Sequence, residues 1–266
     1  MSILKKIVYY FNLYSNIKNV SEYRKNRKHR DERALEFITR PNPIKFSVSA
    51  SMYPVFKEVF CWDAYQISKL IKRLPTSPTV IDIGANCGFF DVLLLSKRPK
   101  SRILAFEPLP VNVAIINATL NANAGMSKQM QLFPEAVTGN KNGQLELHIE
   151  NSENNSEIAS VYADFDERNT RKIVVPCRSL ATILNENGMQ TIDLLKMDCE
   201  GSEFDILYNT PADSLKKIKY ISAEVHDLDG EKRNVGSLSA FLQQHGFKVS
   251  SSVLSDSCFY LQASLT

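Results

Sequence analysis

The sequence contains 266 residues, of which 44% are hydrophobic and 23% charged, a composition typical of a globular protein with one sizeable core. Its net charge of +3 is unevenly distributed: residues 1–40 carry ten basic and four acidic residues, which leaves the other 226 residues at −3. A mildly acidic body excludes a general nucleic-acid-binding surface, and we expect no nucleic-acid partner.

The five cysteines are scattered, odd in number and form no C-x-x-C pair. This pattern argues against a zinc site or a disulfide framework and is typical of a reducing compartment. No apolar run approaches the ~20 residues that are needed to span a bilayer. The short stretch from Ile7 to Tyr14 lacks the small-residue cleavage site of a secretory signal. We therefore expect a cytoplasmic protein.

The first 40 residues have the pattern of a helical segment. Apolar residues recur there at spacings of three and four, and a charged run from Glu22 to Arg33 follows. We expect a basic helical N-terminal extension over residues 1–43. On the sequence we favour packing of this extension on the domain or at a homodimer contact. The alternative interpretation is weak contact with an anionic membrane surface, because the excess positive charge of this segment lies beside apolar residues. These residues are Ile3, Leu4, Ile7, Val8 and Phe11.

The remaining residues, 44–266, are expected to form a single α/β domain. After an aromatic-rich lead-in (44–75), short apolar runs alternate with helical patterns. The predicted strands are 80–83, 102–106, 130–133, 192–197 and 220–225. The predicted helices are 88–97, 111–122, 203–207 and 237–245, followed by a hairpin over 247–253 and 258–263. Continuous apolar strands separated by helices indicate a doubly wound, mostly parallel sheet covered on both faces. The polar segment 151–170 predicts a mobile functional loop.

A glycine turn follows the first apolar strand, in the segment from Val80 to Gly88 (VIDIGANCG). Gly84 and Gly88 let the backbone turn sharply and approach a ligand, and the helix that follows offers free N–H groups. A tight turn without a ligand is the alternative. The dinucleotide fingerprint G-x-G-x-x-G is not met, because Asn86 and Phe89 occupy its second and third glycine positions.

Acidic side chains end three of the other predicted strands. Glu107 ends the next strand along the chain, where a carboxylate would hold ribose hydroxyls and repel phosphates. Asp198 ends a buried strand and is followed by Glu200. Glu224 and His226 end a further strand and share a face by period-two alternation. Histidine is the natural proton acceptor near neutral pH.

Taken together, these segments resemble the FkbM family of methyltransferases. The resemblance covers roughly residues 50–228, and its most specific block is K-x-D-x-E-G-x-E. It implies a seven-stranded class I methyltransferase sheet, Rossmann-like, with the last strand antiparallel. It also implies S-adenosylmethionine as the cofactor and methyl transfer to a hydroxyl of a sugar, a glycan or a secondary metabolite. The segments that carry the resemblance are Val80–Gly88, Phe106–Pro108, Asn117–Asn121, Leu195–Glu203 and Glu224–His226.

The resemblance also implies roles for single residues. The methionine part of the cofactor would be surrounded by Asp82, Gly84, Ala85, Asn86 and Gly88. Glu107 would hold the ribose, and Ala136 would contact the adenine through its backbone.

The candidate general base is His226, with Asp198 or Glu224 orienting it or the acceptor hydroxyl. A divalent metal held by these three residues is a weaker alternative, because carboxylate and imidazole ligands suit Mg or Mn only moderately; we predict no metal. Two other functions stay open: an NAD-linked oxidoreductase, and a catalytically silent nucleoside-binding scaffold.

Overall fold

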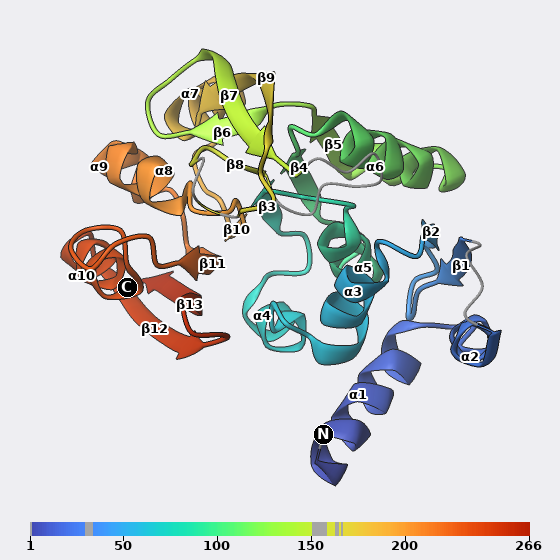
Figure 1. Ribbon diagram of the computed structural model, residues 1–266. Helices are drawn as coiled ribbons and strands as arrows, with labels where there is room; N and C mark the ends of the chain where they lie inside the picture. Colours follow the sequence, from blue (N-terminus) through green and yellow to red (C-terminus); the bar gives the residue numbers. More distant parts are fainter. Residues whose placement is uncertain (1, 30–33, 151–158, 163–164, 166) are drawn as a thin grey trace.

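The computed structural model describes residues 2–29, 34–150, 159–162, 165 and 167–266 (Figure 1). Residues 151–158, 163, 164 and 166 of the predicted mobile loop lie outside the described residues, so that prediction stays untested. Among the residues that are described, none of the helices combines the length and the apolar character needed to cross a bilayer.

The centre of the molecule is a seven-stranded sheet with the strand order β12-β13-β11-β10-β3-β4-β5. Its strands are β3 (Thr79–Ile83), β4 (Arg102–Phe106), β5 (Met130–Phe133), β10 (Leu194–Met197), β11 (Tyr220–His226), β12 (Phe247–Val253) and β13 (Cys258–Leu265). Neighbours from β11 to β5 pair in parallel, whereas β13 is antiparallel to both of its neighbours. This confirms the predicted α/β sheet with its antiparallel last strand.

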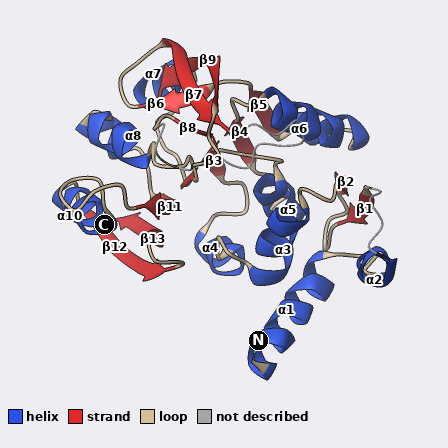
Figure 2. Cartoon of the chain, viewed as in Figure 1, coloured by secondary structure: helices blue, strands red, loops and turns tan. Residues whose placement is uncertain are grey.

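Both faces of this sheet are buried because successive side chains of its strands point to opposite sides. Val80 packs into one hydrophobic cluster and its neighbour Ile81 into another. Helices cover the two faces, as Figure 2 shows with the strands in red between blue helices. They are α4 (Ile67–Arg73), α5 (Phe89–Lys97), α6 (Pro110–Ala122), α7 (Leu180–Glu186), α8 (Glu203–Asn209), α9 (Ala212–Leu215) and α10 (Val235–Gln244). A short 3₁₀ turn, η2 (Met126–Lys128), precedes β5.

The N-terminal part contains α1 (Ile3–Asn16) and α2 (Ser21–His29), but residues up to 40 are not all helical. Leu35–Ile38 forms a strand, β1, which pairs antiparallel with β2 (Lys45–Val48). The reason is local: Leu35 and Phe37 are buried and Glu36 is exposed, which is strand alternation. The π-helical turn η1 (Glu58–Trp62) continues α3 (Tyr53–Lys57).

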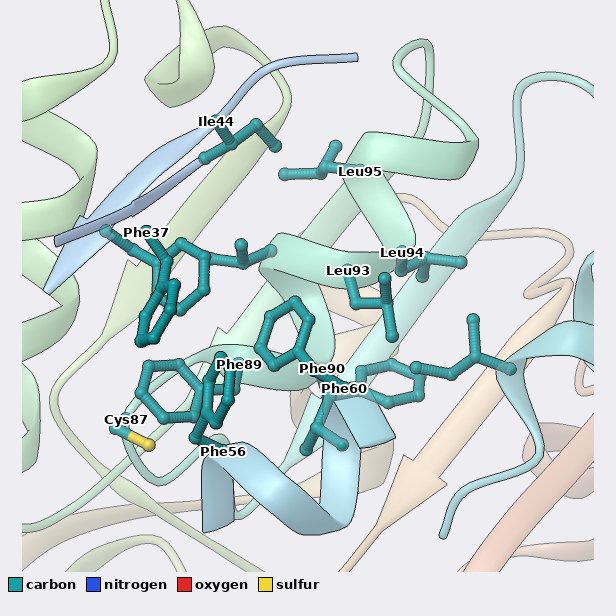
Figure 3. Packing of buried hydrophobic residues seen from close by; sticks show 14 of the residues in the cluster. Phe37, Ile44, Phe56, Phe60, Cys87, Phe89, Phe90, Leu93, Leu94 and Leu95 are labelled. Carbon is teal, nitrogen blue, oxygen red and sulfur yellow. The ribbon is translucent and has the colours of Figure 1, made fainter. Parts of the chain in front are cut away.

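The N-terminal elements share one core with the main sheet. Phe37 stacks on Phe56 with ring centroids 4.5 Å apart, and Phe60 lies edge-on to Phe89 of α5 (Figure 3). Tyr9, Leu13 and Ile17 belong to the same cluster of buried residues. Removing residues 1–40 would therefore open this core.

A second sheet that the sequence did not predict has the order β6-β9-β7-β8. It consists of β6 (Ala136–Thr138), β7 (Gly143–Ile149), β8 (Ala159–Ser160) and β9 (Arg171–Ser179) and lies at the top of Figure 1. Leu147, Val175 and Cys177 bury one of its faces together with Leu109 from the main domain. The small sheet therefore packs against the loop that follows β4.

Candidate active site

A cavity lies at the carboxyl edge of β3, β4 and β10. Ile83 pairs with both Phe106 and Met197, so the residues that follow these three strands lie side by side. The cavity encloses about 650 Å³ when the space that is continuous with solvent is included. The small sheet covers it with apolar side chains. Its walls include Gly84, Asn86, Glu107, Asp198, Glu200, Ala136, Leu145, Leu147 and Ala159.

The glycine turn brings β3 unusually close to β10. Gly84 has a φ of +77°, and a Cβ atom there would lie 1.8 Å from the carbonyl oxygen of Asp198. Gly88 also has a positive φ and is the residue before α5. Gly84 and Asn86 line the cavity, whereas the side chain of Ala85 is buried and Gly88 faces Ile116. Position 84 therefore requires glycine because a larger side chain would clash with the backbone of Asp198.

Glu107 forms part of the cavity wall but is only 4% exposed. Its Oε2 accepts a hydrogen bond from the backbone N–H of Asn86 at 2.8 Å. Its Oε1 accepts from the N–H of Leu109 at 2.9 Å and from the Asn112 amide at 3.3 Å. Burial raises the pKa of Glu107 to about 7, although the two backbone donors oppose the shift. The carboxyl is held rigidly and keeps lone pairs for further donors.

Asp82, predicted to contact the cofactor, lies behind the turn and outside the cavity lining. Its carboxylate is fully buried and lies 3.0 Å from the ammonium of Lys196, which also donates to the carbonyl of Gly84 at 2.7 Å. Burial and the nearby Asp82 raise the pKa of Asp91, which lies beside this pair, well above its usual range. The structure therefore shows Asp82 supporting the glycine turn through Lys196.

The cavity is anionic. Its described lining contains no lysine, arginine or histidine. It contains four carboxylates, which are Glu107, Glu135, Asp198 and Glu200. Arg178 pairs with Glu135 and balances that charge from outside the lining. The three other carboxylates favour a cationic ligand and disfavour a phosphate.

Asp198 has a partner that the sequence did not predict. The hydroxyl of Tyr65, which lies between η1 and α4, donates to Asp198 Oδ2 at 2.5 Å. The ring of Tyr65 also lies 5.1 Å from the ammonium of Lys196. Tyr65 belongs to the aromatic-rich lead-in, but nothing in the sequence distinguishes it from the neighbouring aromatic residues. One tyrosine thus contacts both charged residues of the K-x-D block.

His226 and Glu224 lie together at the end of β11, as their alternation predicts. His226 Nε2 is 3.6 Å from Glu224 Oε1 and 3.5 Å from Glu200 Oε2. Burial, followed by the charge of Asp198, raises the pKa of Glu224 to about 7. These carboxylates would stabilise a protonated imidazole. His226 Nδ1 is buried and has no hydrogen-bond partner among the described residues.

Cys258 is a further neighbour that the sequence did not single out. It lies opposite His226 in the β11–β13 register, and its thiol donates to Glu224 Oε1 at 3.1 Å. Glu224, His226 and Cys258 offer ligand atoms within 4.8 Å of one another, so the nearest trio includes Cys258 in place of Asp198. Glu224 Oε1 is the centre of this group, because both the Cys258 thiol and His226 Nε2 lie next to it.

A second, more open cavity lies on the His226 side of Glu200. It contains about 1020 Å³, much of it continuous with solvent, and combines aromatic with polar side chains. The ring of Phe165 lies edge-on to His226, with centroids 5.2 Å apart. Its described walls are Tyr162, Phe165, Glu200, His226, Asp227, Leu228, Arg233 and Ser257. Glu200 lines both cavities, and its φ of +53° turns the backbone between them.

Among the known proteins that share sequence with this chain, three differ in the share of their own length that aligns with it. The AMB antimetabolite synthetase AmbE of Pseudomonas aeruginosa is 30% identical over 232 residues, which cover 74% of this chain but 10% of AmbE. The 31-O-demethyl-FK506 methyltransferase FkbM of Streptomyces tacrolimicus is 28% identical, over 66% of this chain and 75% of its own length. The 2-O-methyltransferase NoeI of Sinorhizobium fredii is 28% identical, over 61% and 68% respectively.

The family model of the methyltransferase FkbM domain matches residues 82–249. This segment runs from the end of β3 into β12 and contains the glycine turn, Glu107, the K-x-D block and His226. Tyr65 and Cys258, which complete the site in space, lie outside it. The strand order and the antiparallel β13 agree with the class I methyltransferase sheet that the resemblance implies. The chain belongs to the FkbM family of methyltransferases.

Proposed function

We propose that this protein transfers a methyl group from S-adenosylmethionine to a hydroxyl oxygen of a sugar, a glycan or a secondary metabolite. The observation that carries the proposal is that two cavities meet at Glu200. One is lined by carboxylates at the strand ends, and the other by His226 with aromatic and polar side chains. Direct transfer requires donor and acceptor in adjoining spaces, held in line.

The first cavity suits the cofactor. S-adenosylmethionine supplies a methyl group that is already activated by a positively charged sulfur. Asp198 and Glu200 place negative charge where the ammonium and sulfonium would lie, and Glu107 offers acceptors for ribose hydroxyls. Leu145 and Leu147 provide an apolar wall for adenine beside Ala136. The pyrophosphate of NAD would instead meet carboxylates without a compensating cation in the described lining.

The second cavity suits a hydroxylated acceptor. Tyr162 and Phe165 present ring surfaces on which the apolar face of a sugar can pack. Asp227 and Ser257 add polar groups, and Arg233 lies with its guanidinium 5.0 Å from the ring centroid of Tyr162. This mixture of aromatic and hydrogen-bonding groups favours a polyol over a purely apolar substrate.

His226 is our candidate for removing the acceptor proton. It lines the second cavity, and Glu200 and Glu224 lie on its Nε2 side, where they would stabilise the imidazolium that forms. Asp198, fixed by Tyr65, would orient the reacting groups. The names of two relatives, FkbM and NoeI, describe methyl transfer to oxygen, which supports a hydroxyl as the acceptor.

Calorimetry with S-adenosylhomocysteine and NADH tests the cofactor. We expect S-adenosylhomocysteine to bind and NADH to give no heat. Binding of NADH alone would assign an oxidoreductase, and binding of neither would show that the first cavity is not a site for either cofactor; both results overturn the proposal.

Label transfer from methyl-tritiated S-adenosylmethionine tests the acceptor atom. Each methyl glycoside that accepts label is compared with its deoxy analogue at the methylated position. Loss of labelling in the analogue supports transfer to oxygen, and equal labelling overturns it.

A further inference from the structure

The helix α1 presents a row of large apolar side chains to the outside. They are 43–79% exposed: Ile3, Leu4, Ile7, Val8, Phe11 and Tyr14. At about 100° per residue, they occupy one continuous arc of about 140° around the helix. Tyr9, Leu13 and Asn16 lie on the opposite side and are buried. The exposed arc is therefore a coherent apolar face, which isolated surface residues would not produce.

This face cannot turn inward, because the other side of α1 is fixed to the body. The amides of Asn12 and Asn16 donate to the backbone carbonyls of Cys61 and Phe60 at 2.9 and 3.0 Å. The hydroxyl of Tyr9 lies 2.7 Å from that of Tyr23 in α2. Rotating the helix would break these contacts. The apolar arc is held outward by the fold, and α1 extends from the lower end of the molecule in Figure 1.

Cations lie near both the first and the last turn of α1, beside the apolar arc. On the helix, Lys5 and Lys6 fall on its two flanks, outside the arc. Near its other end, the guanidinium of Arg24 lies 5.7 Å from the ring centroid of Tyr14. Lys18 and Arg40 line an open hollow together with Tyr14. An apolar face bordered by cations is the pattern of a helix that lies in the interface of an anionic membrane.

We propose that α1 docks this protein on an anionic bilayer surface, with its apolar arc at the boundary of headgroups and acyl chains. The helix is about 21 Å long at 1.5 Å per residue, so it lies along the surface. A second copy of the chain fits the arc less well, because it would bring together two segments that each carry +6. An anionic bilayer has the opposite charge. The docking does not depend on the identity of the methyl acceptor.

Vesicle flotation with the full chain tests this surface. The vesicles are pure phosphatidylcholine, or phosphatidylcholine with about 30 mol % phosphatidylserine. The first variant, Ile7→Glu with Phe11→Glu, places charge in the arc. The second, Lys5→Gln with Lys6→Gln, removes its flanking cations. The matched control, Val174→Glu with Val253→Glu, alters two exposed valines on β9 and β12.

We expect the wild type and the control to float with the anionic vesicles and not with the neutral ones. Both α1 variants should bind anionic vesicles about tenfold or more weakly, with unchanged thermal melting because the altered side chains are exposed. Equal flotation of the wild type and the Ile7→Glu, Phe11→Glu variant overturns the proposal. So does a dimer in sedimentation equilibrium that this variant dissociates, since the arc would then bind a second copy.

Discussion

Gly84 lies against the backbone of Asp198 so closely that a Cβ atom at position 84 would be 1.8 Å from the Asp198 carbonyl oxygen. This contact lies where the ends of β3 and β10 meet, and both residues line the cavity. The ammonium of Lys196 supports the same turn from behind, through the Gly84 carbonyl. The geometry of the candidate site therefore depends on two residues. Gly84 allows the close approach to Asp198, and the buried Lys196 binds the carbonyl of Gly84.

Replacing Gly84 should be severe. We expect Gly84→Ala to destabilise the fold by more than about 3 kcal/mol, since it adds a steric clash to a left-handed backbone. The measurement is urea unfolding followed by circular dichroism. Gly230→Ala is the control, because no atom lies within 4 Å of its Cβ position, and it should change stability by less than about 0.5 kcal/mol. Similar small effects for both would contradict the close contact.

Lys196 is expected to be essential for stability. Lys196→Met leaves the carboxylate of Asp82 buried without its partner, which should cost about 3–5 kcal/mol in urea unfolding. Adding Asp82→Asn should recover part of this loss, because the uncompensated charge is then removed. Lys219→Met is the control: its ion pair with Asp193 is partly exposed, and its loss should cost less than about 1 kcal/mol. If Lys196→Met lowers the free energy of unfolding no more than the control does, Lys196 is not essential for stability.

Glu107 should make cofactor affinity depend on pH. Its pKa of about 7 means that the carboxylate, the stronger acceptor for ribose hydroxyls, predominates only above neutral pH. We expect S-adenosylhomocysteine to bind about tenfold more tightly at pH 8 than at pH 6 by calorimetry. Glu107→Gln should flatten this dependence and weaken binding at pH 8 by about 1–3 kcal/mol.

The same shift has a consequence for stability. Since burial raises the pKa of Glu107 in the folded state, the protonated carboxyl favours folding at acidic pH, and this contribution is lost as the pH rises through about 7. The free energy of unfolding of the wild type, measured in urea, should therefore decrease as the pH rises toward about 7. The decrease should be larger than that of Glu107→Gln over the same pH values. Parallel profiles for the two proteins would show that Glu107 is not the titrating group.

Tyr65 should act through Asp198. Tyr65→Phe removes the hydroxyl that donates to Asp198 and should lower turnover by about tenfold or more, the effect of losing a hydrogen bond to a charged group. Tyr208→Phe, whose hydroxyl donates to Lys232 at the surface, is the matched control and should retain full turnover. Methyl transfer from labelled S-adenosylmethionine measures both. Equal rates would assign Tyr65 to packing alone.

His226 should determine the proton-transfer step. We expect His226→Ala to lower turnover by roughly 10²-fold with little change in the affinity for S-adenosylhomocysteine. His245→Ala, at the end of α10 and outside both cavities, is the control. If the pH–rate profiles of the wild type and His226→Ala have the same shape, another group takes the proton.

The sequence by itself determined the main sheet and its acidic edge. The period of a strand is a local property, and the alternation of strands with helices makes the strands parallel. Apolar runs that end at Gly84, Glu107, Asp198 and Glu224 therefore predict that these residues lie at one carboxyl edge. The first three line the cavity, and Glu224 lies beside the second one with His226. The family resemblance rests on those same local blocks.

Only the tertiary structure decided which of these groups face the ligand space and which face each other. Asp82 and Lys196 lie opposite each other in the register of β3 and β10 and pair behind the turn, while Tyr65 reaches Asp198 across 133 positions of sequence. Cys258 meets Glu224 only because β13 runs antiparallel to β11. Such contacts depend on strand order and register, which arise from the packing of distant segments. Local sequence patterns do not contain that information.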